Sequence, residues 1–147
     1  MKMKFLITLI TFLVCSNGFS QNKELIQNSN LEKILVEFPI PYKDALNTFK
    51  KLKSADDYFY SANIRTKRKK SELDSTTIYI AIREYQYSIK LDQKHWASYR
   101  NISRLFVMIN RKDLALISIA EAIRYSKKED RASLYKMKSL IETKPNN

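Results

Sequence analysis

Two segments of this chain repeat one pattern of residue types. The first segment begins at Ala81 and the second at Ala115, and in both a small residue follows seven positions later, at Ser88 and Ala122. A repeat of about 34 residues, the spacing of these two alanines, accommodates two helices and a turn. The spacing therefore predicts antiparallel helix pairs that lie side by side.

Helix breakers are scarce, which favours long helices. The 147 residues include one glycine and three prolines. Apolar residues recur at helical spacing over about 23–37, a stretch ended by Pro39 and Pro41, and over about 42–64, a stretch that can break near Ser54.

Four further helices are expected at about 76–91, 95–109, 112–126 and 129–142. Asn110 lies at the turn between two of them, where it is expected to take the left-handed conformation of a helix C-cap. No segment alternates apolar and polar residues convincingly, as a strand does, so the predicted fold class is all-α.

Residues 1–20 have the layout of a secretory signal peptide. Two lysines open the segment, an almost unbroken apolar run follows from Phe5 to Cys15, and small residues precede an expected cut between Ser20 and Gln21. The run is short for a membrane span, which needs about 20 residues. An uncleaved membrane anchor and a lipid attached to Cys15 are the alternatives. We expect export to the periplasm or cell envelope of a Gram-negative-type bacterium, or secretion.

Cleavage at that point would leave a chain without cysteine or glycine, since Cys15 and Gly18 are the only ones. Such a chain has no thiol chemistry and no glycine-rich phosphate loop, so we expect no metal and no cofactor. Of the charged residues only Lys2 and Lys4 would leave, so the formal net charge would fall by two from +12. The remaining basic surplus favours acidic partners or an anionic surface, and export argues against nucleic acid.

A basic cluster interrupts the predicted helices. Like charges repel one another, so we expect a solvated loop over 65–75. The loop could contact acidic protein, anionic lipid or another polyanion, or have no partner at all. Its basic residues are Arg65, Lys67, Arg68, Lys69 and Lys70.

Residues suited to catalysis are sparse. His95 is the only histidine and stands beside Trp96, so a structural role is expected. Asp56 and Asp57 are adjacent and point about 100° apart on a helix, which does not suit an acid/base pair. A small hydrolase would need a pocket that gathers two carboxylates, or His95 with a carboxylate.

Residues 96–126 resemble one tetratricopeptide unit. The positions that match the family's pattern are Tyr99, Ile102, Ser103 and Phe106 on the first helix, and Ala115, Ile119 and Ala122 on the second. A degenerate unit precedes it, with Tyr58, Ser61, Ala62, Arg65, Ala81, Tyr85 and Ser88 in the corresponding positions. Gln93 and Lys127 replace the usual prolines, and Arg65 occupies an aromatic position. The resemblance implies a short right-handed stack of helix hairpins over 55–147, with helices in 21–54 covering one end.

The resemblance also implies a protein–protein interaction module without catalytic activity. In this family the first helix of each unit lines a groove that holds a peptide or a partner helix. The residues expected there are Asn63, Arg100, Asn101, Arg104, Met108 and Arg131. Asn63, Asn101 and Arg131 resemble a carboxylate clamp that lacks its lysine, because Phe59 stands in that place. The alternatives are that these are ordinary solvated residues, and that the protein binds membrane or envelope surfaces through its basic loop.

Overall fold

The computed structural model describes residues 29–39, 52–67 and 72–145. It divides into one unit that ends at Leu35 and a second that begins at Val36. In the first unit, residues 29–34 form a short helix that ends ahead of Pro39. The remainder of the predicted N-terminal helix, the signal-like segment and residues 42–51 lie outside the described residues.

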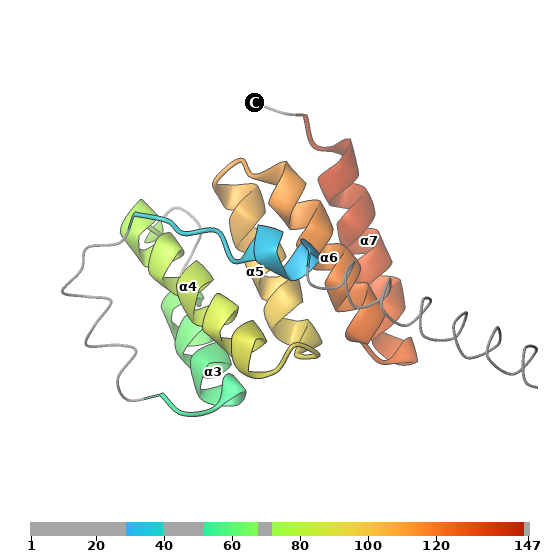
Figure 1. The fold of residues 1–147 in the computed structure, drawn as a ribbon. Helices are drawn as coiled ribbons and strands as arrows, with labels where there is room; N and C mark the ends of the chain where they lie inside the picture. The colour runs from blue at the N-terminus through green and yellow to red at the C-terminus, as the bar shows by residue number, and fades with distance from the viewer. Residues whose placement is uncertain (1–28, 40–51, 68–71, 146–147) are drawn as a thin grey trace, which may run out of the picture. The chain divides into compact units, whose positions relative to one another are not determined.

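The second unit is built from successive α-helices joined by short connections (Figure 1). They are α3 (Ala55–Thr66), α4 (Ser75–Leu91), α5 (Trp96–Met108), α6 (Lys112–Tyr125) and α7 (Arg131–Thr143), with the short 3-10 helix η2 (Lys128–Asp130) ahead of α7. The described ranges contain no strand, and the all-α prediction is confirmed.

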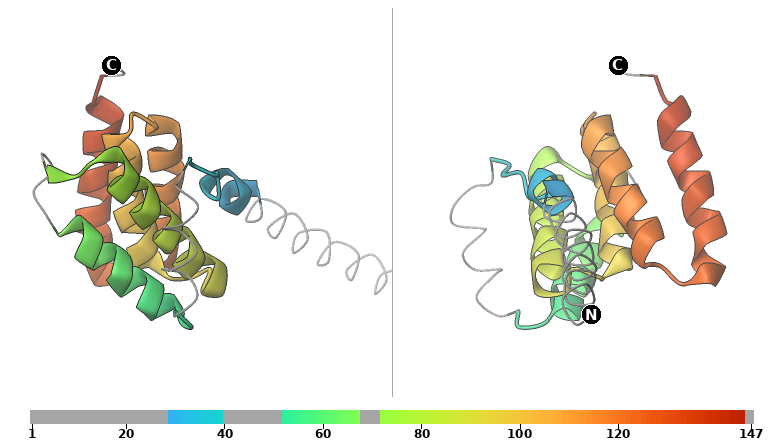
Figure 2. Two further views of the ribbon diagram at one scale, coloured as in Figure 1. Left: turned by 90° about the vertical axis from the view of Figure 1, so that its left-hand side faces the viewer. Right: turned by 45° about the vertical axis from the view of Figure 1, so that its right-hand side comes forward.

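Each helix packs against the next one in the chain, and α3–α4 and α5–α6 form the most extensive pairs. In Figures 1 and 2, α3, α5 and α7 run in one direction, and α4 and α6 run in the other. The arrangement is a stack of antiparallel helices, in which α7 ends the stack as a single helix against α6.

Local capping fixes where these helices begin. Ser54 accepts a hydrogen bond from the Asp57 N–H at 3.1 Å, while the Asp57 carboxylate accepts one from the Ser54 N–H at 3.1 Å. This capping box starts α3 and accounts for the predicted break near Ser54. Asp74 caps α4 by accepting from the Thr77 N–H at 2.7 Å.

Small side chains lie where the helices of a pair meet. The Ser103 hydroxyl donates to the Ala115 carbonyl at 2.9 Å, so α5 and α6 approach closely at that point. Ala122 is also fully buried. Larger buried side chains, among them Phe106 and Ile119, fill the space around this contact. The α3–α4 pair has small, fully buried residues of the same kind, Ala62, Ala81 and Ser88.

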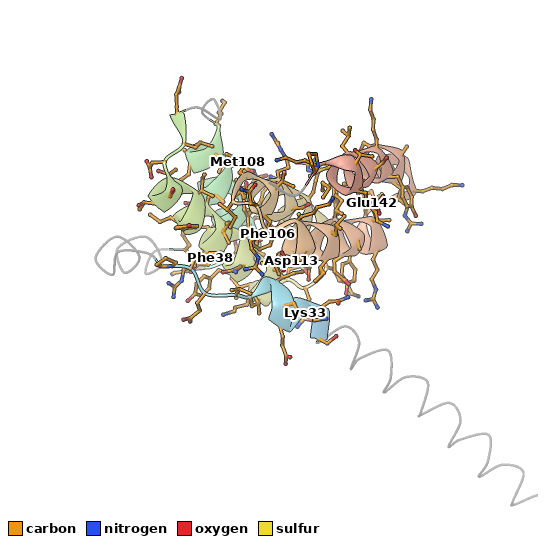
Figure 3. The ribbon with its side chains drawn as sticks, turned by 90° about the horizontal axis from the view of Figure 1, so that it is seen from above. Lys33, Phe38, Phe106, Met108, Asp113 and Glu142 are labelled. Atoms are coloured by element: carbon orange, nitrogen blue, oxygen red, sulfur yellow. The ribbon has the colours of Figure 1, made fainter. Side chains whose placement is uncertain are left out.

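An extended segment at 36–39 packs on the helices of the second unit. Phe38 stacks on Tyr79 with ring centroids 5.3 Å apart and lies 6.1 Å from Phe106. The Gln86 amide donates to the Val36 carbonyl at 2.8 Å. Figure 3 shows Phe106 between Phe38 and Met108, so this segment covers the face opposite Met108.

Asn110 has a φ of 59°, which confirms the predicted left-handed turn between α5 and α6. A β-branched residue is strained there, so Asn110→Val should lower the free energy of unfolding by about 1–2 kcal/mol. Asn110→Gly, the matched control, should leave it equal or higher. Urea denaturation measures both variants. Equal losses in the two would show that the Asn110 side chain, rather than the backbone conformation, matters.

Candidate binding groove

A groove with a volume of about 740 Å³ runs across the first helix of each pair and the final helix. Its walls come from α3, α5 and α7, and Leu73 and Tyr85 complete the lining. Five of the six residues predicted for a binding surface line it, namely Asn63, Arg100, Asn101, Arg104 and Met108. The sixth, Arg131, lies outside the lining at the start of α7, where its guanidinium is 3.5 Å from the Ser126 carbonyl oxygen.

A hydrogen-bond network connects the polar residues of the groove. The Asn63 side-chain oxygen accepts from the Tyr85 hydroxyl and from the Asn101 amide, both at 2.7 Å. The same Asn101 amide lies 3.3 Å from the Tyr85 oxygen, and the Asn101 oxygen accepts from Arg100 Nε at 3.0 Å. Burial raises the pKa of Tyr85, which keeps its hydroxyl protonated as a donor.

The groove has a positive lining. Among the residues that the structure describes, four cationic side chains line it, Lys67, Arg100, Arg104 and Lys144, and no carboxylate does. Lys67 and Arg104 are exposed, and their side chains make no hydrogen bond or ion pair within the described residues. Cations gathered in a concave site reinforce one another's field, so the groove favours anionic groups.

Exposed apolar side chains also gather here. Tyr60, Ile64 and Leu140 line the groove with 61%, 74% and 63% of their surface exposed. They are three of the five large apolar side chains exposed in the described part of the chain; the others are Leu91 and Tyr135. Apolar surface that clusters in a concavity is typical of an interaction site, whereas isolated residues need no explanation.

Sequence reasoning missed a buried ionic cluster between α3 and α4. Glu84 is fully buried and accepts hydrogen bonds from the Ser61 hydroxyl at 2.6 Å and from Arg65 Nε at 3.0 Å to both oxygens. Placing Arg65 in a solvated basic loop was therefore wrong: it belongs to the last turn of α3 and pairs with Glu84. The signal available in the sequence was Arg65 itself, a charged residue at a position where the tetratricopeptide pattern has an aromatic one.

At the corresponding positions the second helix pair has no counterpart of this cluster. Phe106 occupies the position that corresponds to Arg65. Ser118, which stands one repeat length after Glu84, is buried with no partner for its hydroxyl. Burial raises the pKa of Glu84, and the hydrogen bonds from Ser61 and Arg65 oppose that shift.

Of the remaining loop residues, Lys67 lines the groove, and Arg68, Lys69 and Lys70 lie outside the described residues.

His95 contacts a carboxylate, but away from the groove. Its Nε2 lies 3.1 Å from Asp56 Oδ1, and its Nδ1 accepts from the Ser98 N–H at 3.2 Å, which caps α5. The Ser98 hydroxyl is 2.8 Å from that Nδ1 and donates to Ser88 at 2.8 Å. Ser98 is fully buried, and none of these residues lines the groove. The role of His95 is therefore the capping of α5 through Nδ1.

The described residues show neither a metal site nor a membrane span. They contain no group of three histidine, cysteine or acidic residues placed to hold a metal. None of the helices described is both long and apolar enough to cross a membrane. Comparisons of the chain with protein-family models, with curated proteins and with solved structures return no match.

The raised pKa of Glu84 has a measurable consequence. Just above pH 4.5, the ordinary value for this carboxyl group, the native protein keeps a proton that the unfolded chain has released. Since the native state then binds more protons, the free energy of unfolding should fall as the pH rises through that interval. Glu84→Gln removes this contribution, so its free energy of unfolding should fall less than that of the wild type.

Chemical denaturation of both proteins from about pH 4 to about pH 8 tests this expectation, because that range brackets the ordinary carboxyl values and the region above them. Glu129→Gln, at an exposed position in η2, is the matched control and should keep the wild-type profile. Identical pH profiles for the wild type and Glu84→Gln would contradict the assignment.

Proposed function

We propose that this chain is an exported, tetratricopeptide-like adaptor that binds another protein in the groove and carries out no chemical step. The periplasm or cell envelope of a Gram-negative-type bacterium is its proposed location. The observation that carries the proposal is the groove itself. It combines exposed apolar side chains with unpaired cations in one concavity along α3, α5 and α7.

Two features support recognition rather than reaction. The lining, as far as the structure describes it, brings no histidine, cysteine or carboxylate to the groove. Its titratable side chains are lysine, arginine and tyrosine, and burial keeps the Tyr85 hydroxyl protonated. His95 and Asp56 lie outside the groove, and the other ring nitrogen of His95, Nδ1, caps α5. The groove instead offers shape, apolar surface and positive charge, which are the means of noncovalent binding.

Binding to an anionic surface through the basic loop is the alternative. The two described basic residues of that loop, Arg65 and Lys67, support it less well than they support the adaptor. Arg65 is neutralised by Glu84, and Lys67 faces the concavity rather than a flat exposed surface. A flat membrane contact would be served better by cations spread over a convex face, because screening limits the reach of each charge to about 8 Å at physiological ionic strength.

A matched pair of substitutions tests the adaptor. Ile64→Asp places a charge among the apolar residues of the groove, and Leu91→Asp places one at an exposed apolar residue outside it. Affinity purification from envelope fractions should return one stoichiometric protein with the wild type and with Leu91→Asp. Ile64→Asp should lose it, since a carboxylate among the apolar residues would interrupt their surface, pair with the groove cations and repel an anionic partner.

Circular dichroism of both variants provides the control for folding, and both residues are exposed, so the helical signal should not change. Retention of the same protein by Ile64→Asp would rule out the groove as the binding site. Binding of the wild type to anionic vesicles, and to no protein, would favour the surface-binding alternative instead.

A further inference from the structure

We propose that the groove accepts an amphipathic α-helix whose carboxylates flank an apolar stripe, rather than an extended peptide. This inference rests on the proposed function of the groove as a protein-binding site. Three features of the groove support it: the sign of its charge, the hydrogen bonds that its amide side chains already make, and the spacing of its apolar residues.

The charge of the lining selects an acidic occupant. Arg104 projects from the middle of α5 without an ion-pair partner, and Lys67 does so at the end of α3. Lys144 adds a third cation where α7 ends. With no carboxylate among the described residues of the lining, an occupant must supply the negative charge, and an uncharged one would leave these cations uncompensated in the groove.

The amide side chains of the groove argue against an extended backbone. An extended peptide needs partners for its N–H and C=O groups, and asparagine side chains commonly provide them. Here the Asn101 amide donates to Asn63 and to Tyr85, and the Asn101 oxygen accepts from Arg100. The Asn63 oxygen accepts two hydrogen bonds. A helix satisfies its own backbone and does not need these groups.

The apolar residues form two ridges that suit a helix. Tyr60 and Ile64 are four positions apart, so they lie one turn apart on α3. Met137 and Leu140 are three positions apart and line the groove from α7. A helix that lay over α5 could pack its own side chains between these two ridges, as neighbouring helices do in proteins. The occupant would then take the place of a further helix in the stack.

Other occupants from this protein have the wrong charge. The N-terminal segment carries Lys2 and Lys4 and no acidic residue before Glu24. A second copy that docked groove to groove would set cations against cations, and the whole chain has a net charge of +12. The observations therefore favour a separate acidic partner.

A phage-displayed library of random peptides of about 16 residues, long enough for four helical turns, tests the proposal when it is selected against the full chain. We expect the selected peptides to carry Leu, Ile, Met or Phe at positions i, i+3 or i+4, and i+7, with Asp or Glu beside that stripe. Circular dichroism of synthetic versions should show helix on binding. Their affinity should fall about tenfold in the double variant Arg104→Glu, Lys67→Glu, since both substitutions replace attraction to the peptide carboxylates with repulsion.

The control is Lys94→Glu with Lys127→Glu, which makes the same change in net charge at exposed positions outside the groove and should leave the affinity unchanged. Selected peptides that need the groove cations but bind without helical periodicity would overturn this inference and leave the adaptor function standing. A failure to select any peptide sensitive to the groove variants would count against both. Acidic peptides that bind equally well to both double variants would also overturn it.

Discussion

The close approach of α5 and α6 at Ser103 and Ala115 is the contact on which the rest of this structure depends. A hydroxyl that reaches the backbone carbonyl of the next helix at 2.9 Å leaves no room for a larger side chain at either position. Small residues here let the two helices share a tight interface, and Phe106 fills the space beside it. The position of α5 is set by this contact, and α5 in turn forms the middle of the groove.

The α3–α4 pair reaches the same arrangement by different chemistry. Its interface contains a buried carboxylate, Glu84, held by Ser61 and Arg65, where the second pair has apolar and small residues. A buried ion pair adds little net stability, because desolvation offsets the attraction, yet removal of one partner is costly. The cluster therefore restricts which side chains α3 can carry at Ser61 and Arg65. It also pairs the Arg65 cation, which would otherwise add to the charge of the surface.

Much of the fold was accessible from local sequence signals. Apolar periodicity and capping residues such as Asp74 act within one or two turns, and the predicted limits of α4, α5 and α6 agree with the structure to one residue. The left-handed Asn110 followed from its place between two helices.

What the sequence could not show was pairing across helices. Glu84 needs Arg65 from another helix, and Lys144 joins the groove only through the position of α7. Arg131 was assigned to the groove from an alignment with the tetratricopeptide pattern, whereas it lies at the start of α7, outside the lining.

The attachment of α7 gives the groove one wall that differs from the others. Only Leu134 and Ile141 of this helix are buried, which corresponds to roughly 3–6 kcal/mol of apolar transfer free energy. Lys112 adds a tether, since its ammonium donates to the carbonyls of Glu142 and Lys144 at the end of the helix. The other two walls belong to complete helix pairs. A ligand of a different width would thus be accommodated mainly by displacement of α7, while α3 and α5 keep their positions.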